Sequence, residues 1–474
     1  MSVPAQPETR HRKFGEALAI LRLAGPLVFN NLALAGMNFA DTVMAGRLGT
    51  RDLAAVAVGG SAWMVVFLCG LGVLMAVSPV VAHAYGAGRW EDTGGVLRQA
   101  LWLSQALAVL AFTALLGAPL LLATIGIDPE VVPLTAGYLF AISFGLPGVF
   151  AFLAMRFMSE GLGWTRPIMY AAAVGLVVNV CGNWLLMYGN LGFPRLGAVG
   201  CGIASAIAMW CMFATMLLYL RKSPRYERFA LWRGFEWPRW STQRDILGLG
   251  LPIAASVEAE AGLFAGVALI MGTLGATQVA GHQIAINYAA TMFMVPLAFH
   301  SATTIRVGQA LGRAEPALAR LAGWSGIGLC GAFMLLSALV LLLFREHIAS
   351  FYTNDPELLP LATSLLTMAM IFQVSDGLQV GAAGALRGFK DTRVPMLMNV
   401  GSYWLIAFPM AWYAGVHARL GPVAIWIALI AGLTVTAVLL NTRFARLSNR
   451  RVAAAAASRD ALAAGGEAGD PASR

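Results

Sequence analysis

The chain has 474 residues, of which 59% are hydrophobic and only 12% are charged. A soluble protein of this length could not hide so much apolar surface, so the composition excludes a soluble globular protein. The net charge of +9, from 32 lysines and arginines against 23 acidic residues, would suit nucleic acid only if the excess lay on one accessible face.

Windows of about 20 nearly apolar residues recur along the chain, and each is long enough to cross roughly 30 Å of hydrocarbon as an α-helix. Their runs of Leu, Ala, Val and Met do not alternate with polar residues as the strands of a membrane barrel do. The sequence therefore predicts an all-α integral membrane protein with twelve transmembrane helices, centred near residues 30, 66, 109, 145, 179, 209, 260, 293, 332, 372, 406 and 432.

The basic residues set the predicted topology. The first 14 residues are polar and basic, lead directly into a long span, and are expected to be a cytoplasmic tail without a cleavable signal peptide. With the N-terminus in the cytoplasm, 27 of the 32 Lys and Arg lie on that side, which follows the positive-inside rule. Both termini are expected in the cytoplasm, and nucleic acid is not an expected partner. The exceptions are Arg47, Arg51, Arg195, Arg345 and Arg419.

The two halves of the chain repeat one another. At a shift of 226 residues, "LAGPLVFNN" (23–31) aligns with "LGLPIAASV" (249–257) and "AYGAGR" (84–89) with "ALGRAE" (310–315), and a shift of 227 aligns "EGLGWTRP" with "RGFKDTRV". An even number of spans per copy predicts a parallel repeat about an axis along the membrane normal. We expect an N-lobe at 15–221, a C-lobe at 245–446 and a central cleft between them, with the basic loop 222–244 joining the lobes.

Charged groups inside the first lobe are rare and therefore informative. Asp41 lies in a predicted span, where an ionisable group costs at least about 2.5 kcal/mol and is suspected of function. Asn179 and Asn183 lie four residues apart on one helical face, and Ser205 adds a hydroxyl from the next span. Oxygens gathered in this way suit a monovalent cation or a relayed proton. Asn38 lies on the face of Asp41, and its part is left open.

The second lobe carries the other carboxylates that lie well inside apolar spans, Glu258, Glu260 and Asp376. Glu258 and Glu260 are about 200° apart on a helix, so they cannot both face one cavity. Gln283 and Asn287 recur at a spacing of four, and Gln373 precedes Asp376 by three. Both polar stripes are expected to line the cleft. Helix-to-helix hydrogen bonding is the alternative explanation for these polar groups.

The prolines predict where helices begin or bend. Pro26 and Pro252 occupy equivalent positions of the repeat and are expected to open their spans, where a missing N–H costs little. Pro79, Pro147, Pro296 and Pro409 lie deeper, where a proline can kink a helix.

The remaining signals are mostly negative. The chain has neither a phosphate-binding G-x-x-x-x-G-K-[ST] loop nor an H-E-x-x-H or G-x-S-x-G motif, so we expect no ATP binding, no enzymatic activity and no cofactor. The five cysteines are scattered singly, and we expect no disulfide and no metal beyond a Na⁺ ion at Asp41 or at Glu260 and Asp376. The Ala- and Gly-rich tail at 447–474 is expected to be cytoplasmic and disordered.

Several long segments of the chain resemble the multidrug and toxic compound extrusion (MATE) transporters, specifically the NorM-like bacterial branch. The segments include "GPLVFNNLALAGMNFADTVMAGRLG", "AGHQIAINYAATMFMVPLAF" and "SDGLQVGAAGALRGFKDTRVPM", and the resemblance covers about residues 15–445. It implies two six-helix lobes around an outward-open or inward-open cavity. It also implies export of organic cations in exchange for Na⁺ or H⁺ across the bacterial inner membrane. We expect the protein to be a monomer.

The resemblance also suggests roles for individual residues. Asp41, Glu260 and Asp376 match carboxylates that family members use for cation coupling or drug binding. The expected cation-coupling residues are Asp41, Glu260, Asp376, Asn179, Asn183 and Ser205. The expected substrate-binding residues are Asp376, Glu260, Asp41, Gln283, Asn287 and Gln373.

This sequence departs from the family pattern at three places. Asn183 stands where some members have Asp, Ser205 stands where Thr is common, and Glu258 occupies a position expected to be aromatic or apolar. Two other functions remain open: a lipid-linked oligosaccharide flippase of the same superfamily, and a membrane receptor or scaffold without transport. The flippase is disfavoured because the predicted spans hold almost no buried arginine for a pyrophosphate.

Overall fold

The computed structural model describes residues 7–124, 128–232 and 234–467. Within these ranges, eleven helices are long and apolar enough to cross a membrane, and one bent pair makes a twelfth span. This confirms the twelve predicted spans. The elements of the first lobe are α1 (Pro7–Leu48), α2 (Thr50–Leu74), α3 (Val77–Gly86), α4 (Trp90–Thr124), α5 (Val131–Ser143), α6 (Leu146–Gly161), α7 (Arg166–Leu186), η1 (Asn190–Gly192) and α8 (Gly197–Lys222).

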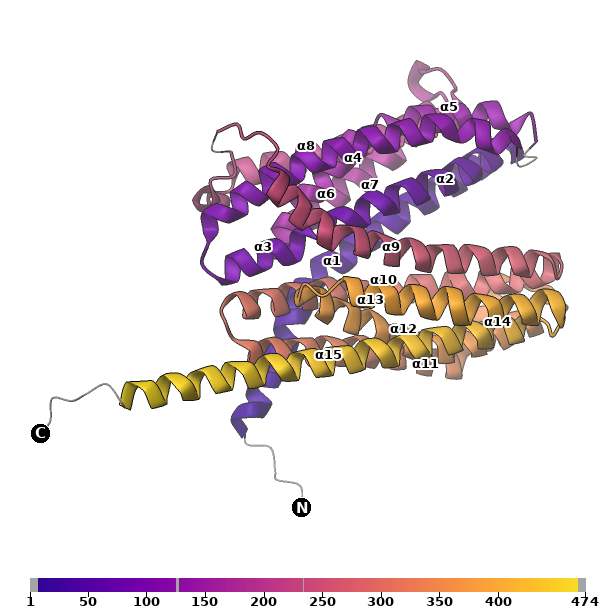
Figure 1. The fold of residues 1–474 in the computed structure, drawn as a ribbon. Coiled ribbons are helices and arrows are strands. Elements are labelled where there is room, and N and C mark those ends of the chain that lie inside the picture. The colour runs from indigo at the N-terminus through magenta and orange to yellow at the C-terminus, as the bar shows by residue number, and fades with distance from the viewer. Residues whose placement is uncertain (1–6, 125–127, 233, 468–474) are drawn as a thin grey trace, which may run out of the picture.

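The second lobe repeats this order after the connecting segment η2 (Pro224–Phe229). Its elements are α9 (Trp240–Gly272), α10 (Ala276–Gly312), α11 (Pro316–Tyr352), α12 (Leu358–Gly388), α13 (Arg393–Gly401), η3 (Ser402–Ala407), α14 (Phe408–Trp412), η4 (Tyr413–His417) and α15 (Pro422–Glu467). The helices form two bundles, one from each half of the chain, which lie against each other near α3 and diverge toward the other end (Figure 1).

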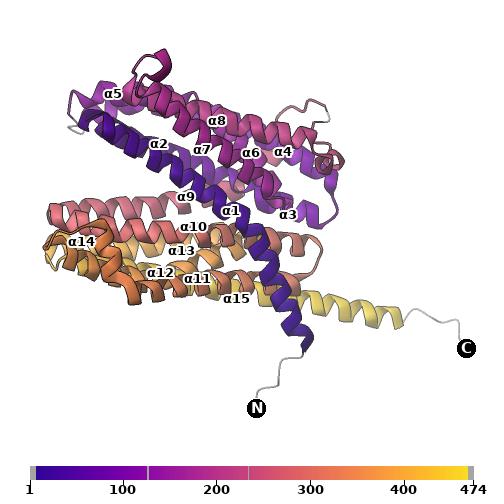
Figure 2. The same ribbon diagram turned by 180° about the vertical axis from the view of Figure 1, so that it is seen from behind.

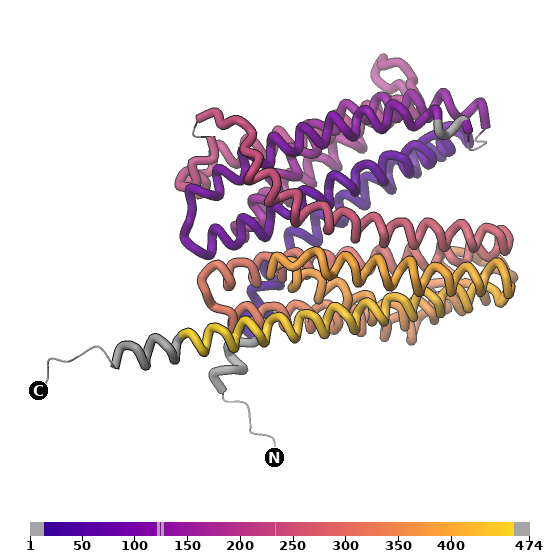
Figure 3. Tube along the Cα trace, viewed as in Figure 1, coloured from indigo at the N-terminus to yellow at the C-terminus, as the bar shows by residue number. Residues whose placement is uncertain are grey.

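The first helix of each lobe reaches across to the other lobe. α1 packs on α2 and α7 of its own lobe and also on α10 and α11 of the second lobe, and the view from behind follows it from one bundle to the other (Figure 2). In the same way α9 packs on α2 and α4 of the first lobe before it joins α13 and α14 (Figure 3). The two lobes are therefore interlocked by a pair of crossing helices.

Breaks in the helices coincide with some of the prolines. Pro147 follows a 46° bend between α5 and α6, Pro79 lies in the first turns of α3, and Pro409 lies in α14 between two π-helical segments. Pro296 is accommodated inside the continuous helix α10. A proline has no N–H to donate to the preceding turn. At a helix break this costs less than inside a continuous helix, because the helical hydrogen bonds are already interrupted there.

Two expectations about helix ends are wrong. Pro26 and Pro252 do not open their helices, because α1 begins at Pro7 and α9 at Trp240, well before them. The tail expected to be disordered is helical as far as Glu467, since α15 continues without a break through its alanine run. Alanine has the highest helix propensity, which outweighs the low complexity of this segment. Residues 468–474 lie outside the described residues.

Candidate functional site

The first buried site is built around Asp41 of α1. The Asp41 Oδ1 atom accepts hydrogen bonds from Asn179 Nδ2 at 3.0 Å and from Asn183 Nδ2 at 2.5 Å, and its Oδ2 atom accepts one from Ser205 Oγ at 3.3 Å. The exposed fraction of Asp41 is 8%, and the other three residues are buried almost completely. The structure therefore brings together the four residues that the sequence placed on neighbouring spans.

Helix geometry explains why these side chains meet. α7 lies against both α1 and α8, and the four-residue spacing of Asn179 and Asn183 places both amides on the face toward Asp41. Asn183 Oδ1 has no hydrogen-bond partner among the described residues. The site thus offers a carboxylate and a free amide oxygen, and no described Lys, Arg or His interacts with Asp41.

Sequence reasoning missed two neighbours of Asp41. Cys201 of α8 and Tyr138 of α5 are both close enough to interact with the Asp41 carboxylate electrostatically. Cys201 precedes Ser205 by four residues and so shares its helical face, which was a usable signal. Tyr138 comes from a different span, and spacing alone could not have found it.

The second site pairs the half-buried Glu260 of α9 with the buried Asp376 of α12. The two carboxyl groups interact electrostatically with each other, and both interact with Tyr403 of η3. Gln379 donates a hydrogen bond to the Tyr403 hydroxyl. Asp376 Oδ1 has no hydrogen-bond partner among the described residues. Two carboxylates that interact in this way favour a bound proton or cation, because both cannot remain charged without repulsion.

Gln373 does not line a cleft, contrary to expectation. Its side chain is fully buried, and its Oε1 atom accepts a hydrogen bond from Ser337 Oγ at 2.6 Å. Ser337 is in turn 3.2 Å from the hydroxyl of Tyr288. Asp376 is also buried, with 4% of its surface exposed. The polar stripe of α12 faces the interior of the second lobe, because α10, α11 and α15 cover it.

The other predicted residues occupy different surroundings. Gln283 and Asn287 are exposed on one face of α10, as their spacing predicted, and Asn38 is exposed on α1. Glu258 lies apart from the Glu260 site and interacts electrostatically with Cys69 of α2 in the other lobe. The two glutamates of α9 thus face different neighbours, in agreement with their angular separation on the helix.

The lobes meet along a seam in which repeat-equivalent residues contact one another. His83 Nε2 lies 2.8 Å from the Gly388 carbonyl oxygen, and Gln309 Nε2 donates to the Gly161 carbonyl oxygen at 3.0 Å. Residues 83 and 309 are related by the shift of 226, and residues 161 and 388 by the shift of 227. The two hydrogen bonds are therefore symmetry mates across the pseudo-two-fold axis.

Two glycines allow the backbones to approach at this seam. A Cβ atom on Gly86 would meet the Gln309 carbonyl oxygen first and would lie 3.0 Å from the Gln309 Cα. A Cβ on Gly312 would meet the His83 carbonyl oxygen first and would lie 2.9 Å from the Gly86 Cα. Gly86 and Gly312 are also repeat-equivalent. Close contact of α3 with α10 at this point leaves no room for a side chain on either glycine.

A buried charge cluster lies beside the same axis and was not foreseen. Arg156 Nε donates to Glu160 Oε1 at 2.7 Å inside α6, and Glu160 interacts electrostatically with Arg387 of α12. Glu160 is 1% exposed and Arg156 is 8% exposed. The expectation of almost no buried arginine is therefore wrong for Arg156, and Glu160, in the last turn of α6, was not among the carboxylates that the sequence singled out. The arginines are balanced by Glu160 at the seam rather than grouped as a pyrophosphate site.

Fold and site together define an integral membrane protein made of two repeated six-span lobes, each with a buried carboxylate that has no cationic partner among the described residues. The MatE family model matches residues 26–185 and again 252–413. The second match begins 226 residues after the first, which is the shift found in the sequence. The matches cover more than half of the chain, and the protein belongs to the MatE family, as its resemblance to the NorM-like branch predicted.

Full-length bacterial relatives agree with this assignment. The chain is 42% identical over 96% of its length to the probable multidrug resistance protein NorM of Xanthomonas campestris, covering 100% of that protein. It is 40% identical to the multidrug resistance protein PmpM of Pseudomonas aeruginosa, over 95% of this chain and 96% of that one.

Solved structures share the fold. A eukaryotic MATE transporter, AtDTX14, superposes with a TM-score of 0.84 at 18% identity, over 93% of this chain and 100% of that one. A MATE protein in a bent conformation gives a TM-score of 0.85 at 22% identity, over 94% and 98%. The two-lobed helical architecture expected from the sequence is therefore confirmed.

Proposed function

We propose that this protein is a secondary active multidrug exporter of the bacterial inner membrane, which expels organic cations in exchange for Na⁺ or H⁺. The observation that carries the proposal is the isolation of the Asp41 carboxylate. It is buried at membrane depth, receives hydrogen bonds only from neutral groups, and has no cationic partner among the described residues. A site of this kind is costly unless a proton or metal cation occupies it during the working cycle.

The second lobe supports the same function with a different arrangement. Glu260 and Asp376 repel each other when both are ionised, so the pair favours one added positive charge. That charge can be a coupling ion or the cationic group of a drug. The exposed amides Gln283 and Asn287 of α10 lie in the same lobe and would contact the polar parts of the substrate.

We infer that the conformation is outward-facing. With cytoplasmic termini, as the basic residues predict, α2 and α10 run inward toward the seam at Gly86 and Gln309. The lobes are thus in contact at the cytoplasmic ends of these helices, and they diverge at the opposite ends (Figure 1). Ion binding at Asp41 or at the Glu260 and Asp376 pair would favour one state, and coupling requires that drug and ion prefer different states.

The test is transport by purified protein in sealed liposomes loaded with ethidium, under an imposed Na⁺ gradient or an imposed pH gradient. We expect one gradient to drive ethidium movement, and Asp41→Asn and Asp376→Asn each to abolish it while the protein remains folded. Glu346→Gln is the matched control, because Glu346 is an exposed carboxylate on α11 and its loss should leave transport unchanged.

The same experiment separates the competing functions. If neither gradient drives ethidium movement but a fluorescent polyprenyl-pyrophosphate lipid is translocated, the protein is a lipid flippase and not a drug exporter. Movement of neither molecule would favour a receptor or scaffold. Transport by Asp41→Asn and Asp376→Asn at the wild-type rate would refute the assignment of the coupling residues.

A further inference from the structure

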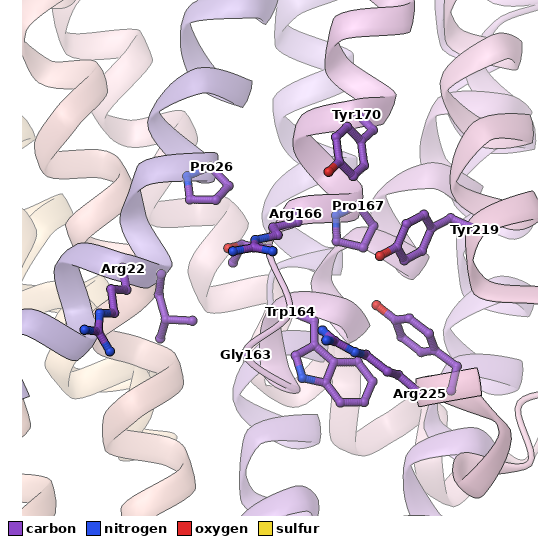
Figure 4. Close-up of a pocket in the computed structure, with 12 residues that line it drawn as sticks. Arg22, Pro26, Gly163, Trp164, Arg166, Pro167, Tyr170, Tyr219 and Arg225 are labelled. Atoms are coloured by element: carbon purple, nitrogen blue, oxygen red, sulfur yellow. The ribbon is translucent and has the colours of Figure 1, made fainter. Parts of the chain in front are cut away.

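A basic pocket of about 460 Å³ lies in the first lobe, and its lining includes no residue of the two carboxylate sites. It is formed by α1, the start of α7, the end of α8 and the connecting segment η2 (Figure 4). Its wall includes three arginines from three separate elements, Arg22, Arg166 and Arg225, and no acidic residue. Drug export as proposed above gives this pocket no role.

The three guanidinium groups have no compensating charge. Each is exposed at the pocket, and none of them has an ion pair or hydrogen bond among the described residues. Guanidinium groups stay charged in proteins, so three of them around one cavity repel each other and create a strongly positive site. Their planar donor forks match the oxygens of a phosphate, and the start of α7 adds the partial positive charge of a helix N-terminus.

The floor of the pocket is held in place before any ligand binds. The Ser159 hydroxyl contacts both the Trp164 carbonyl oxygen and the Tyr226 hydroxyl at 2.6 Å. The rings of Trp164 and Tyr226 pack edge to face at 4.8 Å, and the Arg228 guanidinium lies 5.6 Å from the Trp164 ring centre. Burial raises the pKa of Tyr226, which therefore remains a neutral hydroxyl. A rigid site loses little conformational freedom on binding.

The pocket lies at the depth of lipid headgroups. Arg166 is the first residue of the α7 span, and Arg225 follows the last residue of the α8 span by three positions. Trp and Tyr side chains concentrate at this interface in membrane proteins, and Trp164, Tyr170 and Tyr219 all line the pocket. Arg225 lies across the Trp164 ring and Arg166 lies between Pro26 and Pro167, whereas the side chain of Arg22 extends away from both on the α1 side (Figure 4).

An apolar stripe runs from the pocket toward the bilayer centre. Tyr170, Val174 and Val177 are 46%, 38% and 62% exposed and lie at spacings of four and three on one face of α7. α7 packs chiefly on α1 and α8, which leaves this face open. Acyl chains attached to a phosphate in the pocket would lie along this stripe, which a soluble phosphate compound would not need.

We propose that this pocket binds the phosphate headgroup of an anionic glycerophospholipid from the cytoplasmic leaflet. Arg166 and Arg225 bind the phosphate oxygens, Arg22 adds positive charge from the α1 side, and the acyl chains lie along the exposed stripe of α7. Basic pockets between transmembrane helices on the cytoplasmic side commonly bind acidic headgroups. A lipid bound here would connect α1, which reaches the second lobe, to α7 and to the segment that joins the lobes.

Native mass spectrometry tests the proposal on the full-length protein in detergent with added phosphatidylglycerol or phosphatidylcholine. The variant R22Q/R166Q/R225Q should bind phosphatidylglycerol roughly 100-fold more weakly than the wild type, given the contribution of each basic residue near an anionic lipid. The variant K222Q/R244Q/R450Q is the matched control, because it removes the same charge from exposed positions outside the pocket, and its affinity should change less than threefold.

A positional readout accompanies the affinity. Phosphatidylglycerol brominated near the headgroup should quench the tryptophan fluorescence of the wild type. The quenching should be smaller in the Trp164→Phe variant, which lacks the tryptophan of the pocket. Equal loss of binding in both triple variants, or unchanged binding in the pocket variant, would overturn the proposal. Displacement of the lipid by millimolar inorganic phosphate would also overturn it, because the site would then recognise a soluble phosphate. None of these measurements depends on drug transport.

Discussion

The glycines of the seam provide a direct test of how the lobes are held together. Gly86 and Gly312 have ordinary negative φ angles within or at the ends of helices, so an alanine at either position is compatible with the local backbone. The added methyl group of Gly86→Ala would nevertheless meet the Gln309 backbone, first its carbonyl oxygen and then its carbonyl carbon and Cα at 3.0 Å. Backbone atoms cannot rotate out of the way as a flexible side chain can.

The expected magnitude follows from this distance. Non-bonded heavy atoms prefer separations of about 3.5–4.0 Å, so α3 and α10 would have to move apart by roughly 1 Å or more at the point of contact, where the Gln309 carbonyl oxygen is the nearest atom. Overpacking of this kind costs about 1–3 kcal/mol. Because the cost applies only when the seam is closed, the equilibrium should shift about 5- to 150-fold toward conformations with an open seam. The free-energy costs of Gly86→Ala and Gly312→Ala should be less than additive in the double variant, since a single opening of the seam relieves both clashes.

Electron spin resonance distances between labels at Ala87 and Ala317 would measure the shift. Both residues are exposed and lie beside the seam, one in each lobe. The distance distribution should acquire a longer component in Gly86→Ala and in Gly312→Ala. Gly328→Ala is the control, because nothing lies within 4 Å of its added Cβ. An unchanged distribution in both seam variants would refute the reasoning that close backbone approach limits opening.

Two further predictions concern single hydrogen bonds and ion pairs. Asn183→Ala removes the 2.5 Å hydrogen bond to Asp41 and should destabilise the protein by about 1–3 kcal/mol, measured by thermal unfolding. Asn354→Ala, at an exposed position, is the control and should leave the stability unchanged. An equal melting temperature for both variants would contradict a stabilising role of the hydrogen bond. The Arg98 guanidinium, 2.6 Å away, lowers the pKa of Glu236 below its ordinary value of 4.5. The ion pair therefore holds the inter-lobe loop on α4 at neutral pH, and this stabilisation is lost as the pH falls through the lowered pKa of Glu236. Hydrogen exchange of the loop residues near Glu236, corrected for intrinsic rate, should rise only below about pH 4.5. A rise already between pH 7 and 5.5 would show that this ion pair does not hold the loop in place.

The fold could be predicted because membrane insertion imposes a strong pattern on the sequence. Every span needs about 20 apolar residues, and the duplication appears at one constant shift. The first-lobe site could be predicted for a similar reason, since its residues keep helical spacing within each span. Asn179 and Asn183 reveal their common face without any knowledge of their neighbours.

Other parts of the site depend on which helices cover which faces. Gln373 shares a face with Asp376, but the burial of that face follows from the packing of α10, α11 and α15, which periodicity does not define. The Glu160 and Arg387 pair had a usable signal, because the alignment of "EGLGWTRP" with "RGFKDTRV" sets one residue over the other. An acidic and a basic residue at equivalent positions near a two-fold axis are neighbours in space.

Glu160 and Arg387 have a consequence for how the duplicated chain can assemble. Two identical copies of the second half, arranged about the same axis, would place Arg387 against Arg387 with no acidic residue between them, whereas each Glu160 in two copies of the first half would keep its own Arg156. Like charges buried together are strongly unfavourable, whereas the two different halves bring opposite charges together. When residues 1–230 and 231–474 are expressed as separate fragments in one cell, the second fragment should therefore associate with the first in preference to pairing with itself, because Glu160 supplies the acidic partner that Arg387 would otherwise lack.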